Sequence, residues 1–172
     1  GFRLDSSSLK VDYSAAQKRS KEVSSRLVKG INFLMKKNNI KVYTGTGKLI
    51  EKNKVEIKPQ GDIIEGKNII IATGARPNHI PGIEYDEEKI MTSRGALELK
   101  ELPSKMVVVG AGAIGMEFAS IWNSYGVDVT IIEMMDEILP LEDSDVSKEI
   151  KKQYEKRGIR VLTGTKVEKI KN

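Results

Sequence analysis

The chain has 172 residues, of which 39% are hydrophobic and 31% are charged, and its formal net charge is +5; these proportions are typical of a soluble globular protein that forms one domain or parts of two. Most of the positive charge comes from lysines interspersed with glutamates, and only 5% of the residues are aromatic, so we expect no nucleic-acid-binding surface. The absence of cysteine excludes a disulfide framework and any thiol chemistry performed by this chain itself.

The first expected element is a long helix from Tyr13 to about residue 38. Its apolar residues recur at spacings of four, four and three, as on one face of a helix: Val23, Leu27, Ile31 and Leu34. Asp12 or Ser14 is expected to cap its start, and the pair Asn38 and Asn39 suits its end.

Short strands are expected next. The pattern predicts a strand over residues 40–44, two strand-like pieces around residues 48–57, and a turn at residues 59–61. A strongly apolar strand is expected over residues 68–72. Residues 75–84 contain two prolines and a glycine, so we interpret them as an extended connector and the most plausible domain boundary.

Beyond the connector, Ser93 is expected to cap a short helix over residues 94–99, and Pro103 to end that segment. Residues 106–110, 128–133 and 159–163 are predicted to be neighbouring parallel strands, since all three are apolar. Residues 113–125 and 143–157 are then the crossover helices. The last residues resemble the start of another strand.

The connection after the first of these parallel strands carries a Gly-x-Gly-x-x-Gly turn at Gly110, Gly112 and Gly115. The first glycine permits a tight strand-to-helix turn, the second lets backbone approach a pyrophosphate, and the third lets the helix pack closely on the sheet. The phosphates would face the unpaired N–H groups at the positive end of the helix dipole. This context predicts a dinucleotide-binding site.

Glu133 lies 18 residues beyond the last glycine, at the end of the second parallel strand. There a carboxylate can accept hydrogen bonds from a ribose 2′-OH and would repel a 2′-phosphate. Residues 134–137 (MMDE) supply no cation, so the pattern favours NAD over NADP. The alternative is a solvated carboxylate at a strand end.

Residues 39–54 and 158–172 resemble each other at an offset of 119, since each follows a lysine-rich helix and contains Thr-Gly-Thr after a short apolar segment. Coincidence is one explanation, because helix–strand–turn units are common. The other is that the chain carries matching, incomplete pieces of two related nucleotide-binding domains.

Four segments occur in the order and approximate spacing of one known family: residues 70–77 (IIATGARP), 81–83 (PGI), 110–117 (GAGAIGME) and 133–140 (EMMDEILP). On these the chain resembles an internal fragment of the dihydrolipoamide dehydrogenases, within the pyridine nucleotide–disulfide oxidoreductases. Another disulfide reductase of the same family is the alternative, because the ATG motif is shared across it.

The resemblance implies an α/β fold with parts of two Rossmann-like, three-layer nucleotide-binding domains, together with small β-meander pieces. Residues 1–80 would be the C-terminal part of the FAD-binding domain and residues 81–172 the N-terminal part of the NAD-binding domain. The implied NAD contacts are Gly110, Ala111, Gly112, Ala113, Ile114, Gly115, Met116, Glu117, Glu133 and Val167. The implied FAD contacts are Gly47, Thr73, Gly74 and Ala75. The alternative for the FAD contacts is that these glycine-containing turns bind no ligand. The alternative for Val167 is that it is an ordinary core residue.

By the same resemblance, the parent enzyme oxidises protein-bound dihydrolipoamide and passes electrons through a redox disulfide and FAD to NAD. Its partners would be a lipoyl-bearing 2-oxo acid dehydrogenase complex or the glycine cleavage system, and the parent would be a homodimer. The first FAD glycine turn, the redox cysteines and the His–Glu pair of the family have no counterpart here. We therefore expect no catalytic residue in this chain and no activity of the chain alone.

His79, the one histidine, is interpreted as an exposed loop residue rather than a catalytic base. A stand-alone NAD-binding module without redox activity is the rival hypothesis. We expect no metal site, no membrane contact and a cytoplasmic location, because no apolar run approaches the roughly 20 residues of a membrane span and no secretory signal opens the chain.

Overall fold

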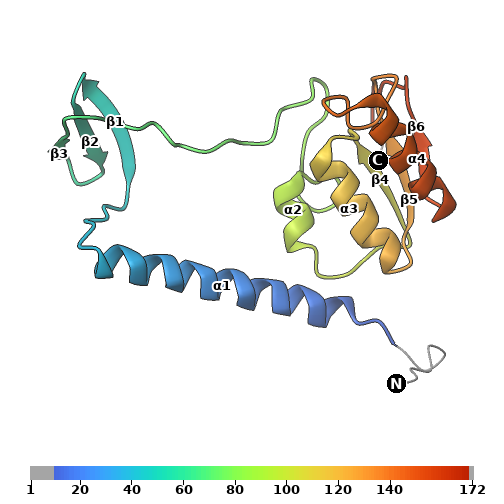
Figure 1. The fold of residues 1–172 in the computed structure, drawn as a ribbon, viewed down its shortest axis with the longest axis horizontal. Helices are drawn as coiled ribbons and strands as arrows, with labels where there is room; N and C mark the ends of the chain where they lie inside the picture. The colour runs from blue at the N-terminus through green and yellow to red at the C-terminus, as the bar shows by residue number, and fades with distance from the viewer. Residues whose placement is uncertain (1–9, 171–172) are drawn as a thin grey trace. The chain divides into compact units, whose positions relative to one another are not determined.

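A computed structural model describes residues 10–170 of the chain (Figure 1). These residues form two compact units. One unit is Arg19–Arg76, and the other joins the part that begins at Pro77 with the start of the first helix up to Lys18. Each unit has its own sheet, so the two are described separately.

Helix α1 spans Tyr13–Lys37, as the apolar spacing predicts. Asp12 caps its start, because Asp12 Oδ1 accepts a hydrogen bond from the Ala15 N–H at 3.1 Å. At its end Asn38 Nδ2 donates to the Leu34 carbonyl, and Asn39 adopts a φ of 56°, which is a common way for helices to stop. No residue of α1 is buried, so its apolar stripe is exposed.

The Arg19–Arg76 unit contains a three-stranded antiparallel meander, formed by β1 (Thr46–Glu51), β2 (Lys54–Lys58) and β3 (Asp62–Glu65) in that order. The turn between β2 and β3 lies at residues 59–61, as predicted, and the N–H of Gly61 donates to the Ile57 carbonyl at 2.8 Å. The expected β-meander piece of the fold is therefore present.

Two strands predicted for this unit do not form. Residues 40–44 and 68–72 have no strand structure, and neither do the described residues 165–170 of the other unit, which were expected to begin another strand. Apolar, β-branched residues become a strand only when a neighbour supplies a hydrogen-bonded ladder. No strand in the described part of the chain lies beside these segments, and Ile70 and Ile71 are 90% and 75% exposed.

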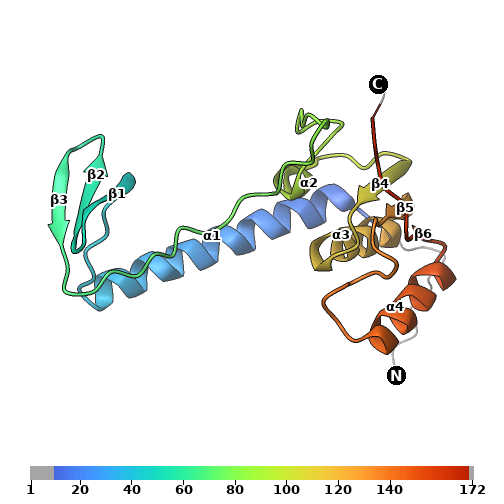
Figure 2. The same ribbon diagram turned by 90° about the horizontal axis from the view of Figure 1, so that it is seen from above.

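The second unit has a three-stranded parallel sheet with strand order β4-β5-β6 (Figure 2). In chain order its elements are α2 (Ser93–Glu98), β4 (Lys105–Val109), α3 (Ala113–Ser124), β5 (Asp128–Ile132), α4 (Ser144–Lys156) and β6 (Arg160–Leu162). The predicted neighbouring parallel strands and their two crossover helices are confirmed.

The cap of α2 is one residue earlier than predicted. Thr92, not Ser93, is the N-cap, and its Oγ1 accepts a hydrogen bond from the Arg94 N–H at 3.2 Å. Adjacent hydroxyl residues are equally suited to the role in sequence, and the backbone path before the helix decides between them. Asp143 caps α4 by accepting from the Asp145 N–H at 2.9 Å.

The core of this unit lies between the parallel sheet and helices α3 and α4. Its buried members are Ala96, Val108, Ala111, Met116, Ala119, Trp122, Val127, Val129, Ile131, Ile138, Ile159 and Val161. Tyr154 Oη donates to the Met116 carbonyl at 2.9 Å, and the Arg157 guanidinium donates to the Ser120 hydroxyl and carbonyl. These bonds join α4 to α3, so the two helices lie next to each other on the sheet.

The first turn of α1 packs on this unit. The ring of Tyr13 contacts that of Tyr125 edge-on, with 5.2 Å between centroids, and Gln17 Nε2 donates to the Leu97 carbonyl at 3.2 Å. Partial burial raises the pKa of the Tyr13 hydroxyl.

Among the described helices, none is both long enough and apolar enough to cross a membrane.

Candidate functional site: the glycine turn between β4 and α3

The glycine turn leaves the carboxyl end of β4 and enters α3 directly. Gly110 adopts a φ of 103°, which favours glycine, and its N–H donates to the Ile132 carbonyl at the end of β5 at 2.8 Å. A Cβ built on Gly115 would overlap the carbonyl oxygen of Gly110. The sequence therefore needs glycine at both positions to bring strand and helix this close.

The start of α3 has unused hydrogen-bond donors. Gly112 is the N-cap and offers no side-chain cap, and the N–H of Met116 is the first to bond back, to the Gly112 carbonyl at 3.0 Å. Within the described residues the N–H groups of Ala113, Ile114 and Gly115 have no backbone partner, and the first turn carries no acidic side chain. Such a helix start attracts a phosphate.

The space in front of this helix start is open. A Cβ built on Gly112 would meet no atom within 4 Å. An anion that needs close approach to backbone N–H groups therefore has room where a side chain would otherwise project, and the residues present fit the pyrophosphate of a dinucleotide.

Glu133 follows β5 and reaches the turn from the neighbouring strand. The residue is only 7% exposed, and its Oε2 accepts a hydrogen bond from the Ala111 N–H at 2.7 Å. Its Oε1 accepts from the Met135 N–H at 2.9 Å. The sequence predicted a carboxylate beside the ribose, and the structure places that carboxylate against the backbone of the glycine turn. A freely solvated strand-end carboxylate, the alternative considered for Glu133, is not what the structure has.

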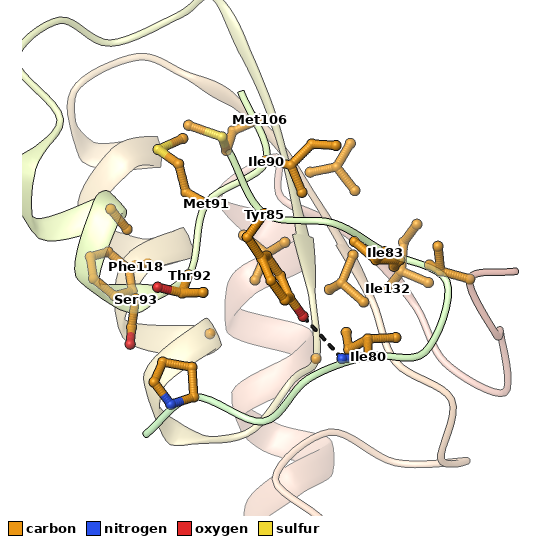
Figure 3. A pocket seen from close by; sticks show the side chains of 18 of the residues that line it. Ile80, Ile83, Tyr85, Ile90, Met91, Thr92, Ser93, Met106, Phe118 and Ile132 are labelled. Atoms are coloured by element: carbon orange, nitrogen blue, oxygen red, sulfur yellow. Dashed lines mark hydrogen bonds between the residues drawn. The ribbon is translucent and has the colours of Figure 1, made fainter. Parts of the chain in front are cut away.

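A cleft of about 1140 Å³ opens beside the turn and runs along β4 (Figure 3). Its lining includes residues of the turn itself and apolar side chains from four parts of the unit. These side chains are Ile80, Ile83, Ile90 and Met91 before β4, Met106 on β4, Phe118 and Trp122 on α3, and Val167 and Ile170 after β6. Large apolar clefts with a few polar groups are the usual form of cofactor sites.

The segment before β4 forms one wall of this cleft, which sequence reasoning missed by treating residues 75–84 as connector only. Tyr85 lies across the cleft, and its Oη accepts a hydrogen bond from the Ile80 N–H at 3.2 Å (Figure 3). The N–H groups of Ile90, Glu88 and Lys89 donate to Asp86 Oδ1 and hold the pKa of that carboxyl below its usual value. The apolar residues scattered through this segment were the available signal.

The remaining residues predicted to contact NAD differ in accessibility. The side chain of Met116 is buried in the core, so only its backbone belongs to the turn. Ala113 and Ile114 are exposed at the helix start, and Glu117 is exposed on α3 and does not line the cleft. Val167 lines the same cleft as the glycine turn.

The residues predicted to contact FAD lie in the other unit. Gly47 is in β1, paired with Ile57 of β2. Thr73, Gly74 and Ala75 lie in an exposed segment without regular structure, where Gly74 has a φ of 74°. No hydrogen bond among the described residues joins this segment to Gly47.

Two further expectations concern histidine and metal. His79 is exposed in a loop, as predicted, and its ring lies 5.3 Å from that of Tyr85, between centroids. Among the described residues, no three His, Cys, Asp or Glu side chains gather closely enough to hold a metal ion.

Comparisons with known proteins agree with this geometry. The family described as "Pyridine nucleotide-disulphide oxidoreductase" matches residues 5–172. A dihydrolipoyl dehydrogenase of Bacillus subtilis is 38% identical over 96% of this chain and 37% of its own length, and one of Mycobacterium leprae is 44% identical over 92% and 35%.

Solved structures show the same likeness. The HOCl-induced flavoprotein disulfide reductase RclA of Escherichia coli, in a copper(II) complex, has a TM-score of 0.83 at 32% identity and covers 94% of this chain and 38% of its own. LpdA of Mycobacterium tuberculosis has a TM-score of 0.81 at 27% identity, over 94% and 37%. The chain spans a little over a third of the length of the curated relatives it matches. The family match over nearly the whole sequence establishes that this chain belongs to the pyridine nucleotide–disulphide oxidoreductases.

Proposed function

We propose that the β4-α3-β5 segment is an NAD-binding site, and that the chain is an internal part of a flavin-dependent dihydrolipoyl dehydrogenase. The observation that carries the proposal is the meeting of two features at one edge of the parallel sheet. The N–H groups of residues 113–115 have no backbone partner, the space beside Gly112 is open, and the carboxylate of Glu133 lies beside the same turn. The dihydrolipoyl dehydrogenases among its relatives support the choice of enzyme.

The chain's residues would bind and orient the dinucleotide. The N–H groups at the start of α3 would donate to the pyrophosphate, with the helix dipole favouring its negative charge. Glu133 would accept a hydrogen bond from the adenosine ribose, and Val167 would contact the adenine from the cleft wall. The hydride chemistry itself belongs to the nicotinamide ring when NAD is bound.

The other unit would contribute to FAD binding in the parent. Gly47 would approach the adenine of FAD with its backbone, and Thr73, Gly74 and Ala75 would contact the flavin nucleotide. Residues 1–80 and 81–172 would be the corresponding parts of the FAD and NAD domains. The parent would be a cytoplasmic homodimer that serves a lipoyl-bearing 2-oxo acid dehydrogenase complex or the glycine cleavage system.

We expect the chain to bind NADH at least about tenfold more tightly than NADPH, a difference of about 1.4 kcal/mol. The reason is the Glu133 carboxylate, which would repel a 2′-phosphate, with no cation among residues 134–137 to offset it. Fluorescence or calorimetric titration with both dinucleotides measures the ratio.

A designed variant sharpens this test. Met134 is 67% exposed and follows Glu133, so Met134→Arg adds a cation where a 2′-phosphate would lie. NADPH affinity should rise several-fold in Met134→Arg and stay unchanged in the matched neutral control Met134→Gln. Equal affinities for NADH and NADPH in the wild-type chain would contradict the NAD assignment.

We also expect this chain to show no lipoamide-dependent NADH turnover, with or without added FAD. The parent reaction needs a redox disulfide, and the chain has no cysteine. A coupled absorbance assay on protein of confirmed mass measures the rate, with a full-length dihydrolipoyl dehydrogenase as positive control. A steady rate above buffer would show that the reacting groups lie elsewhere than proposed.

NADH binding without turnover is equally expected of a stand-alone NAD-binding module. The gene sequence on either side of this chain distinguishes that module from a part of a dihydrolipoyl dehydrogenase.

A further inference from the structure

Ala111, the residue between the first two glycines, is held by both of its backbone groups. It is completely buried, its N–H donates to Glu133 Oε2 at 2.7 Å, and its carbonyl accepts from the Leu139 N–H at 2.9 Å. Both partners belong to the segment 133–142 that follows β5. We call residues 133–142 the brace.

The brace has a defined conformation of its own. Leu139 adopts a φ of 47°, which costs a residue with a Cβ about 1 kcal/mol or more and persists only where the surroundings enforce it. Its carbonyl accepts from the Glu142 N–H at 2.8 Å and from the buried Ser147 hydroxyl at 3.4 Å. Ile138 is buried in the core beside it. The brace is therefore anchored independently of the turn that it contacts.

The brace and the proposed ligand use different faces of the turn. The N–H groups of Gly110 and Ala111 are bonded to the β5 end and to Glu133, whereas those of residues 113–115 are free. A carboxylate has about four lone-pair positions, and the described backbone bonds of Glu133 use one on each oxygen. Glu133 can hold the turn and still accept from a ribose hydroxyl.

We propose that Glu133 is a positioning residue for the pyrophosphate as well as a ribose ligand, and that it couples the two subsites by holding Ala111. This inference rests on the proposed function, because it assumes that a dinucleotide occupies the turn. A carboxylate that acted on the ribose alone would leave the affinity for a ligand without the 2′-OH untouched. A carboxylate that also braces the turn affects every ligand whose pyrophosphate binds there.

The test is a four-way comparison of dissociation constants: NADH and its 2′-deoxyadenosine analogue, each with the wild-type chain and with Glu133→Gln. In the variant an amide NH₂ replaces one of the two acceptor oxygens, so one of the two backbone bonds is lost. The 2′-deoxy analogue should bind Glu133→Gln about tenfold more weakly than wild type, within the usual range of coupling between sites. Unchanged or tighter binding of the analogue overturns the coupling.

Glu137→Gln is the matched control. Glu137 lies in the same brace, but its Oε1 accepts from the Ser144 hydroxyl and not from the turn. Both ligands should bind Glu137→Gln within about twofold of wild type, a difference below 0.5 kcal/mol. A loss as large as that in Glu133→Gln would show that any substitution in the brace weakens binding, and it would overturn the inference.

A measurement on the wild-type chain decides the case in which Glu133→Gln does not fold. Amide hydrogen exchange without ligand should be slowed for Ala111 and Met135 by about 100-fold or more relative to Ala113 and Ile114. Similar exchange rates at all four amides would overturn the inference that Glu133 holds Ala111 in place. Failure of the wild-type chain to bind NADH overturns the proposed function, whereas NADH binding with an unaffected 2′-deoxy analogue overturns the coupling alone.

Discussion

The Gly112→Ala variant is expected to bind a dinucleotide about 100-fold or more weakly than wild type, a loss of nearly 3 kcal/mol of binding free energy, while its folding stability is unchanged. The position has a φ of −73° and open space in front of it, so alanine is compatible with the unliganded backbone. The added methyl group would occupy the volume that the pyrophosphate needs. Titration with NADH measures the loss, and thermal unfolding should show a stability change within about 0.5 kcal/mol.

Gly115→Ala provides the contrasting variant. A Cβ there would overlap the Gly110 carbonyl oxygen, which is backbone and cannot turn aside. The helix must move away from β4, so the free energy of unfolding should fall by about 3 kcal/mol and binding should be lost as well. Wild-type affinity in Gly112→Ala would contradict the proposal that the pyrophosphate binds at this turn. Wild-type stability in Gly115→Ala would show that the strand and helix are not in close contact.

Ile131→Ala is expected to lower the free energy of unfolding of the parallel-sheet unit by about 3–4 kcal/mol. Ile131 is in the central strand β5, between β4 and β6, and none of its surface is exposed. Removing its larger side chain leaves a cavity between the sheet and the helices that cover it. Denaturant unfolding followed by circular dichroism measures the change.

The matched control is Ile121→Ala, since Ile121 lies on α3 with 47% of its surface exposed. Its substitution should change stability by no more than about 1 kcal/mol, because little buried area is lost and alanine favours the helix. Equal losses in the two variants would mean that β5 is not the centre of the core.

Local sequence determined the glycine turn between β4 and α3. Three glycines, the apolar strand before them and the helical pattern after them each constrain the backbone within a few residues, so the β4-α3-β5 unit follows from neighbouring positions alone. The parallel pairing was also predictable, because the connections between its strands are helical and the strands are apolar throughout. Glu133 was chosen as a candidate ribose ligand from its distance to the last glycine, and that role is part of the proposed function.

What Glu133 and the residues before β4 contact was not predictable from spacing. The bond between Ala111 and Glu133, and that between Ala111 and Leu139, depend on how the loop after β5 folds back over the turn. One wall of the cleft is formed by Ile80, Ile83 and Tyr85. Its position depends on the path of a segment that has no helical or strand-like hydrophobic periodicity. Irregular segments take their positions from tertiary packing.

The two similar segments of the chain show most clearly what local sequence determines and what tertiary contacts determine. Residues 40–44 (IKVYT) and 159–163 (IRVLT) have nearly the same local pattern, and each follows a helix. Residues Arg160–Leu162 form β6, because Thr130–Ile132 of β5 supply a parallel ladder and α4 covers the sheet. Residues 40–44 have no such neighbour in the described part of the chain and form no strand. The sequence by itself determined the helices, the turn at residues 59–61 and the glycine turn, whose hydrogen bonds are local, but it gave no sign of β3 (Asp62–Glu65). Only the tertiary structure decided that the similarly apolar residues 40–44 and 68–72 did not become strands, because a strand's backbone bonds are made to another part of the chain.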